Sequence, residues 1–108
     1  METLEKFKVM GLSETTLKAL KKKGFEEPTP IQALTIPLLL AGEKDIVAQA
    51  QTGTGKTAAF GIPLIERLPE RSKKTQALIL TPTRELAVQV TEEISSLKGG
   101  KRVEVFPI

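Results

Sequence analysis

The sequence predicts an α/β fold, because short apolar runs alternate with helical patterns along the chain. Three runs, at residues 45–49, 76–81 and 103–108, have the length and composition of strands. Helical patterns fill the two segments between them, at about 57–68 and 84–98. This order favours a parallel sheet of about three strands with right-handed crossovers and flanking helices. A length of 108 residues suits one domain and not two.

The first expected helix runs from about Ser13 to Lys23. Ser13 is a favourable N-cap residue, and Gly24 is typical of the position just beyond a helix C-terminus. Leu17 and Leu20 give the helix an apolar side. The lysines at 21–23 have two interpretations, a phosphate-binding patch or a solvated last turn that complements the helix dipole; the second is favoured.

A second helix is expected to open at Thr29. Pro30 then falls at its first position, where a missing N–H costs nothing. Gln32 lies three residues after Thr29, so the two side chains can form a capping box. The helix should end before Gly42, which predicts an N-terminal helical segment ahead of the first strand.

The next expected elements are a short strand at 45–49, a glycine-rich loop at 50–57 and a helix at about 57–68. Pro63 lies inside this helix and predicts a kink. Residues 69–75 are polar and predict a connection. The following run, QALILT, is continuously apolar, as expected of a strand covered on both faces.

Another helix is expected after Pro82 and Thr83. Its apolar residues recur at intervals of four, four and three, and therefore lie along one side: Leu86, Val90, Ile94 and Leu97. Gly99-Gly100 should end this helix before the last strand. Because parallel sheets are normally covered on both faces, three strands alone indicate a piece of a larger domain or a chain that needs a partner.

The missing residue types exclude several functions. Without Cys, the chain forms no disulfide, thiolate nucleophile or cysteine-based zinc site. Without His, it has no imidazole base and no Ser-His-Asp triad. The net charge of +3 permits a nucleic-acid partner without establishing one. No apolar stretch is long enough to span a bilayer and no signal-peptide pattern opens the chain, so a cytoplasmic location is expected.

The strongest motif is a phosphate-binding loop between the first expected strand and the next helix. It has eight residues: Ala50, Gln51, Thr52, Gly53, Thr54, Gly55, Lys56 and Thr57. The two glycines let backbone N–H groups curl around phosphate oxygens, and the helix N-terminus adds positive partial charge. Lys56 is expected to reach the β- and γ-phosphates, and the Thr57 hydroxyl to bind Mg²⁺. The general pattern has glycine where this chain has Ala50.

A simpler interpretation of this segment is a Gly-Thr turn with a surface lysine. The strand before it, the helix after it and the Gly-Lys-Thr ending together favour the phosphate loop. The loop by itself predicts nucleotide binding, but neither the base nor the reaction.

Two further segments narrow the class of protein. Residues 24–32 (GFEEPTPIQ) lie upstream of the loop, with Phe7 seventeen residues before Gly24, and residues 82–87 (PTRELA) follow the second strand. Together with AQTGTGKT, they resemble the Q motif, motif I and motif Ia of the DEAD-box RNA helicases, in the family's order and spacing. The resemblance covers essentially the whole chain. It implies part of a RecA-like P-loop NTPase lobe that binds ATP and RNA.

The resemblance implies nucleotide-binding roles for the Q-motif residues. Gln32 would read the adenine edge, because an amide both donates and accepts hydrogen bonds. Phe25 would pack against the base. For Phe7, a place in the nucleotide site and a place in the core remain alternatives. The capping box explains Gln32 without a ligand, and the two roles can coexist.

In motif Ia, the resemblance places Pro82, Thr83 and Arg84 at the RNA sugar–phosphate backbone. A helix N-terminus with a hydroxyl and an arginine is a plausible phosphate contact. The alternative is an ordinary helix cap with a solvent-facing Arg84. Leu86 and Ala87 are expected in the core. Backbone contacts carry no base information, so RNA binding without sequence preference would follow.

Some of the family's motifs do not occur in these 108 residues. The Asp-Glu-Ala-Asp segment, the Ser-Ala-Thr motif and the second lobe are absent. The acidic residues after Ala87 do not end a buried strand beside the loop: Glu92, Glu93 and Glu104. Phosphoryl transfer needs a metal-holding acid and a positioned water. The chain alone is therefore predicted to bind nucleotide without hydrolysing it.

The sequence is interpreted as a truncated first lobe of an ATP-dependent RNA helicase, with a helical Q-motif segment at 1–42 and a P-loop βαβαβ unit at 43–108. The implied cofactors are ATP and Mg²⁺. The implied partners are RNA, the remainder of the lobe and the second lobe, with no membrane. Two alternatives stay open: a non-enzymatic nucleotide-binding or assembly module, and a different P-loop enzyme such as a small-molecule kinase. An uncovered strand also predicts self-association.

Overall fold

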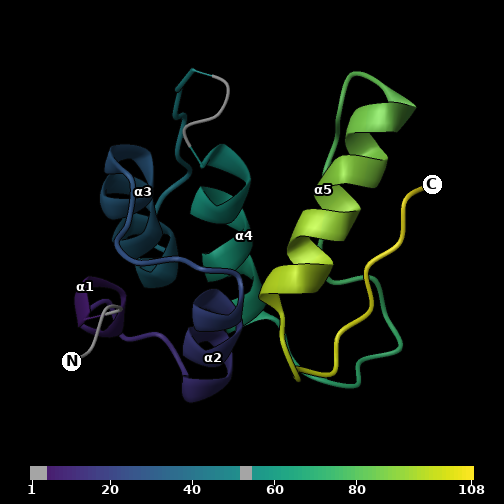
Figure 1. Ribbon diagram of the computed structural model, residues 1–108. Helices are drawn as coiled ribbons and strands as arrows, with labels where there is room; N and C mark the ends of the chain where they lie inside the picture. Colours follow the sequence, from purple (N-terminus) through teal and green to yellow (C-terminus); the bar gives the residue numbers. More distant parts are fainter. Residues whose placement is uncertain (1–4, 52–54) are drawn as a thin grey trace.

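The computed structural model describes residues 5–51 and 55–108, and the elements found there are helices. They are α1 (Glu5–Lys8), α2 (Glu14–Lys22), α3 (Pro30–Ala41), α4 (Lys56–Arg67) and α5 (Arg84–Leu97). In Figure 1, α4 lies between α3 and α5, and α2 lies across the lower part of the molecule. The short α1 was not predicted from the sequence. In the described part of the chain, no helix has the length and apolar character needed to cross a membrane.

The ends of α2 confirm the predicted caps. The Ser13 hydroxyl accepts a hydrogen bond from the backbone N–H of Thr16 at 3.3 Å. Beyond the C-terminus, Gly24 has a φ of +85°. The N–H of Phe25 then bonds back to the carbonyl of Leu20 at 3.0 Å, which is the pattern of a Schellman motif. The positive φ explains why glycine stands at position 24.

The predicted capping box opens α3. The backbone N–H of Gln32 donates to the Thr29 hydroxyl at 3.4 Å, and the backbone N–H of Thr29 donates to Oε1 of Gln32 at 2.9 Å. Pro30 is the first helical residue, and the helix ends before Gly42, whose φ is +67°. Both ends therefore lie where the sequence places them.

Helices α4 and α5 also form close to their predicted bounds. Helix α4 continues through Pro63 to Arg67. Thr83 caps α5, because its hydroxyl accepts a hydrogen bond from an N–H in the first turn. A Cβ on Gly61 would lie 3.4 Å from side-chain atoms of Ile94 and Leu97, which is van der Waals contact, so this face of α4 packs directly against α5.

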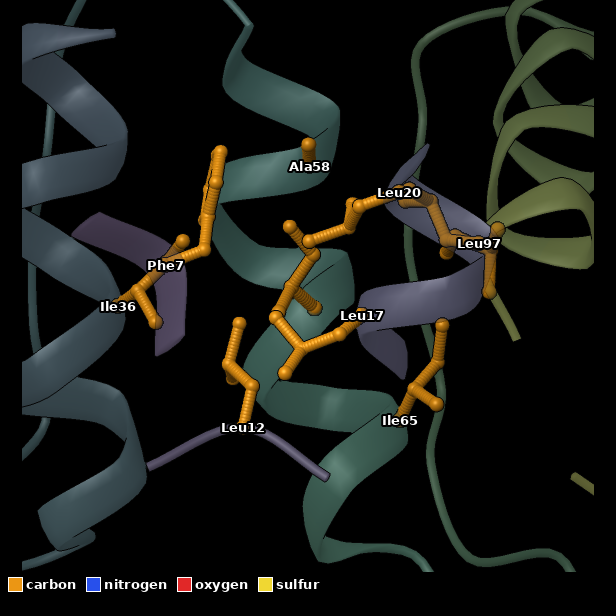
Figure 2. Close-up of a cluster of buried hydrophobic side chains, with 10 residues drawn as sticks. Phe7, Leu12, Leu17, Leu20, Ile36, Ala58, Ile65 and Leu97 are labelled. Carbon is orange, nitrogen blue, oxygen red and sulfur yellow. The ribbon is translucent and has the colours of Figure 1, made fainter. Parts of the chain in front are cut away.

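The hydrophobic core lies where α4 meets the other helices (Figure 2). It combines the N-terminal helical segment with α4 and α5: Phe7, Leu12, Leu17, Leu20, Ile36, Ala58, Ile62, Ile65, Ile94 and Leu97. The segments 1–42 and 43–108 that the sequence separates therefore share one core. Helix α4 contributes to it along most of its length, which makes this helix the centre of the packing.

The described residues form no β-strand, so the predicted parallel sheet of about three strands is not found in this structure. Residues 45–49, 76–81 and 103–108 lie in irregular backbone with exposed apolar side chains, including Leu80 (84% exposed) and Phe106 (72%). A strand is stable only when a neighbouring strand satisfies its backbone groups and other elements cover its faces. In the described part of the chain, the helices pack on one another, and these segments lie beside them without strand pairing, although Val105 packs against the core.

The predicted apolar stripe of α5 is buried at only one end. Ile94 and Leu97 are buried and Val90 is half-buried, whereas Leu86 is 38% exposed. The prediction that Leu86 lies in the core is therefore wrong, and Ala87 is only half-buried. The reason is visible in Figure 1: the C-terminal end of α5 lies beside α4 and α2, and its N-terminal end extends beyond them.

Candidate functional site

The structure describes part of the predicted phosphate loop. Ala50, Gln51, Gly55, Lys56 and Thr57 lie in described segments. The predictions for Thr52, Gly53 and Thr54 fall outside the described residues. Gly55 precedes the first residue of α4 and has a φ of +84°, a backbone conformation that residues other than glycine rarely adopt.

Gln32 joins the start of α3 to the start of α4. Its Nε2 donates to the carbonyl oxygen of Gly55 at 3.2 Å, while its Oε1 accepts from the N–H of Thr29. The side chain is only 2% exposed, so both bonds are shielded from water. This one amide therefore ties the predicted adenine-binding segment to the predicted phosphate loop.

The contact is close enough to exclude a larger residue at position 55. A Cβ on Gly55 would lie 2.3 Å from Nε2 of Gln32 and 3.2 Å from the hydroxyl oxygen of Thr29. No described side chain caps α4, so the N–H groups of its first turn point outward without a side-chain acceptor. An anion placed there would meet both these donors and the positive end of the helix dipole.

Lys56 and Thr57 begin α4 on the open side of this contact. The Lys56 side chain is exposed and forms no ion pair with any residue that the structure describes. Thr57 is half-buried. Ala58 and Ala59 are buried directly behind them and anchor this turn in the core. Among the described residues, the arrangement offers an ammonium group without an ion-pair partner and a hydroxyl beside a helix N-terminus that no side chain caps.

The two predicted aromatic residues lie together, at different depths. The ring centroids of Phe7 and Phe25 are 6.0 Å apart, with the ring planes inclined at 53°. Phe7 is fully buried and belongs to the core, whereas Phe25 is half-buried. In this structure Phe7 supports Phe25 from within the core, and only Phe25 has surface to offer a ligand.

The motif Ia residues lie on the surface at the start of α5. Pro82, Thr83 and Arg84 are all exposed. The Thr83 hydroxyl accepts from the N–H of Leu86 at 3.1 Å, and its carbonyl accepts from the Thr81 hydroxyl at 3.0 Å. In Figure 1 the N-termini of α4 and α5 point toward the same end of the molecule. The start of α4, where the phosphate loop ends, and motif Ia at the start of α5 therefore lie at the same end of the molecule.

Two polar contacts were not predicted from the sequence. One is the bond between Gln32 and Gly55, which are 23 residues apart. The other is made by Glu66 of α4, whose Oε1 accepts from the N–H and hydroxyl of Ser13 and from the hydroxyl of Thr16. Neither pair has a local spacing that signals contact. In the described segments, no group of three or more acidic side chains is placed to hold a metal ion.

Comparison with known proteins identifies the class. The model of the DEAD/DEAH box helicase family matches residues 29–106, a span that includes the phosphate loop, motif Ia and the helices α3, α4 and α5. The chain belongs to this family. The resemblance noted from the three motifs is thereby confirmed.

Individual relatives agree with this assignment. The chain is 56% identical over 102 residues to the DEAD-box ATP-dependent RNA helicase CshA of Geobacillus kaustophilus, and 55% identical to CshA of Bacillus subtilis. These matches cover 94% of the chain, but 22% and 20% of the two relatives, so it spans about a fifth of their length.

Solved structures of the family are also similar. A DEAD box protein from Methanococcus jannaschii matches with a TM-score of 0.87 and 56% identity, over 91% of this chain and 27% of that one. S. cerevisiae Dbp5 bound to RNA and ADP BeF3 matches with a TM-score of 0.81 and 38% identity, over 85% of this chain and 24% of that one. The backbone of the chain is therefore similar to the matching part of these DEAD-box proteins.

Proposed function

We propose that this chain is the ATP- and RNA-binding first part of the first lobe of an ATP-dependent RNA helicase. The observation that carries the proposal is the hydrogen bond from Gln32 to Gly55, which joins the Q-motif segment to the phosphate loop. The names of the CshA relatives, which are ATP-dependent RNA helicases, support it. The segments 1–42 and 43–108 would act as one nucleotide-binding unit because they share a core.

Gln32 retains the hydrogen-bonding capacity that adenine recognition needs. A primary amide has two N–H donors and two acceptor lone pairs on its oxygen. The bonds to Gly55 and Thr29 use one of each, so one donor and one acceptor remain. Adenine presents a complementary pair at N6 and N7. Because Gln32 is 2% exposed in this structure, the residues that cover it would have to move before adenine could pair with the amide. Phe25, held against Phe7, would supply the apolar surface beside the base.

The start of α4 would hold the phosphates. The backbone N–H groups of its first turn and the ammonium group of Lys56 would bind phosphate oxygens, with Ala50 and residues 51–54 completing the loop. Thr57 would donate its hydroxyl oxygen to Mg²⁺. The metal ion would supply charge neutralisation at the β- and γ-phosphates.

The exposed N-terminus of α5 would bind the sugar–phosphate backbone of RNA. Arg84 would contribute the positive charge, with Pro82 and Thr83 shaping the turn. The related Dbp5 structure is described as bound to RNA and ADP BeF3, which supports RNA as the polymer. These contacts do not read bases, so binding would be independent of RNA sequence.

The exposed apolar segments would become the parallel sheet of a complete lobe. Val47, Leu80 and Phe106 each lie in one of the three segments, and all three are exposed. Their burial would require further strands and helices, or self-association of the uncovered edges. A cytoplasmic location stays a prediction of the sequence.

Residues 1–108 alone would bind nucleotide without hydrolysing it. They contain no Asp-Glu-Ala-Asp segment, and the carboxylate of Glu93 on α5 pairs with Lys23 of α2 at 3.0 Å. Purified chain should therefore release no phosphate from ATP with RNA and Mg²⁺ present. RNA-stimulated release that Lys56→Ala abolishes would contradict this. The same missing segment supports the second candidate, a non-enzymatic nucleotide-binding module.

Titration calorimetry with ADP and ATP tests the nucleotide site. Lys56→Ala removes a charge-assisted contact, which should weaken binding roughly ten- to a hundredfold. Lys44→Ala is the matched control, because Lys44 is also an exposed lysine but follows the C-terminal end of α3. Equal affinities for the wild type and both variants would remove the assignment of the phosphate site.

A further inference from the structure

Two neighbouring loops carry a net positive charge. Residues 68–75 and 98–104 contain six basic and two acidic residues, a net charge of +4. The whole chain has a net charge of +3, so the rest of the molecule has a net charge of −1. Nothing in the three helicase motifs uses these loops.

The two loops are held side by side by one hydrogen bond between backbone groups and one from a backbone N–H to a side chain. The N–H of Arg71 donates to the carbonyl of Arg102 at 3.0 Å, and the N–H of Arg102 donates to the carboxylate of Glu70 at 2.7 Å. Arg71 has a φ of +60°, the only positive φ among the described residues other than glycine. Such backbone conformations persist only where surrounding contacts hold them, so the loops have a defined shape.

Four of the six cations are free to bind a ligand. Lys98 and Lys101 donate to the carbonyls of Val103 and Glu66 and are half-buried, so they serve the fold. The other four side chains are exposed and form no ion pair with any described residue: Arg71, Lys73, Lys74 and Arg102. We name these four residues the basic loop surface. The acidic residues beside it are Glu70, which already accepts the N–H of Arg102, and the exposed Glu104.

The basic loop surface lies away from both predicted ligand sites. Lys101 donates to a carbonyl in the last turn of α4, so the loops lie a helix length of about 18 Å from Gly55. Residues 98–104 follow the C-terminus of α5, whose 14 residues separate this loop by about 20 Å from Arg84. Figure 1 shows both loops at the lower end of the molecule, opposite the N-termini of α4 and α5.

The chemistry of this surface fits phosphates better than protein. Protein interfaces depend on apolar and aromatic anchors in a buried centre. The large exposed apolar side chains of the described chain lie outside both loops. Exposed cations that form no ion pair with a described residue, in loops without a large exposed apolar side chain, match instead the repeating charge of a nucleic-acid backbone.

We propose that the basic loop surface is a second contact site for RNA phosphates, at the opposite end of α5 from motif Ia. This inference rests on the proposed binding of RNA. In a helical strand with one phosphate per 3.4 Å, the length of α5 corresponds to about six nucleotides. An RNA of 12 nucleotides is therefore long enough to reach both sites.

The test is fluorescence anisotropy with a labelled 12-nucleotide oligo(U), without nucleotide, from 0.05 to 0.3 M salt. Lys73→Glu/Lys74→Glu removes two phosphate contacts, each contributing roughly fivefold to the affinity at 0.1 M salt, so binding should weaken about 25-fold. The log–log salt slope should fall by roughly 1.4 in magnitude. The control is Lys18→Glu/Lys22→Glu, which makes the same charge change on the exposed face of α2. It should change the affinity no more than twofold to threefold.

Three results would overturn the inference. One is equal weakening by the two double variants, which would show only a general charge effect. Another is an unchanged affinity for Lys73→Glu/Lys74→Glu. The third is stronger competition by polyglutamate than by unlabelled oligo(U) of equal charge, which would indicate an acidic protein as the partner. Arg84→Ala tests the motif Ia contact separately, so failure of that contact would leave the effect of the loop variant intact. Circular dichroism confirms that each variant is folded.

Discussion

Replacing Gln32 tests whether its amide holds the two halves of the candidate site together. In Gln32→Ala, the N–H of Thr29 and the carbonyl of Gly55 both lose their partner in a region where the side chain is 2% exposed. Each lost hydrogen bond costs about 1 kcal/mol, and a group left buried without a partner adds to that cost. The free energy of unfolding should therefore fall by about 2–3 kcal/mol.

Gln32→Glu separates the two bonds. Glutamate still accepts the N–H of Thr29, because a capping box is formed equally well by Glu or Gln. It has no N–H to donate to the Gly55 carbonyl. At neutral pH this variant places a carboxylate, shielded from water, against the carbonyl oxygen of Gly55, so the free energy of unfolding should fall at least as far as in Gln32→Ala.

Urea unfolding followed by circular dichroism measures both changes. The control is Gln89→Ala, since Gln89 is an exposed glutamine inside α5 whose removal should change stability by less than about 0.5 kcal/mol. If Gln32→Ala were as stable as Gln89→Ala, the amide would contribute nothing to the packing of α3 on α4. If Gln32→Glu were as stable as the wild type at neutral pH, the bond from Nε2 to the carbonyl of Gly55 would contribute nothing to stability.

Three further predictions concern the same framework. Gly55→Ala places a Cβ 2.3 Å from Nε2 of Gln32 at a φ of +84°, so the free energy of unfolding measured in urea should fall by about 2–4 kcal/mol. The control is Gly100→Ala, which should be nearly neutral because no atom lies within 4 Å of the added Cβ. Equal stabilities of the two variants would contradict the close contact at Gly55. Glu66→Ala removes the acceptor for Ser13 at the N-terminus of α2 and should lower the free energy of unfolding, measured by thermal unfolding, by about 1–2 kcal/mol. The control is Glu92→Ala, at an exposed site, which should lower it by less than about 0.5 kcal/mol. A loss for Glu66→Ala no larger than that of the control would show that its bonds to Ser13 do not stabilise the fold. Gln32→Ala should narrow any preference for ADP over GDP in calorimetry, and unchanged discrimination by the folded variant would leave Gln32 with a structural role alone.

The helices could be predicted because their signals are local. The N-caps Ser13, Thr29 and Thr83 each bond to an N–H three residues later, and Gly24 and Gly42 stop their helices with a positive φ. Such interactions depend on residues within one turn of each other, so they can be read from spacing. The same holds for the phosphate loop and motif Ia, whose residues are contiguous in the sequence.

Contacts between distant residues could not be predicted in this way. Gln32 reaches a carbonyl 23 residues away, and Glu66 reaches a hydroxyl 53 residues away at Ser13. A one-dimensional pattern states that a side chain is polar or apolar, but not which distant atom it meets. The juxtaposition of the Q-motif segment and the phosphate loop became visible only when α3 was packed on α4.

The sequence by itself determined the helices, their caps and the order of the motifs, because each depends on neighbours within a few residues. The tertiary structure decided which apolar positions are buried. Leu97 is enclosed where α5 meets α4 and α2, while Leu86, on the same predicted stripe, is 38% exposed. The apolar runs predicted as strands also differ from the structure. A strand requires a hydrogen-bonded neighbour and covered faces; in the described residues these segments have no strand partner, and exposed side chains such as Leu80 and Phe106 show that their faces are largely uncovered.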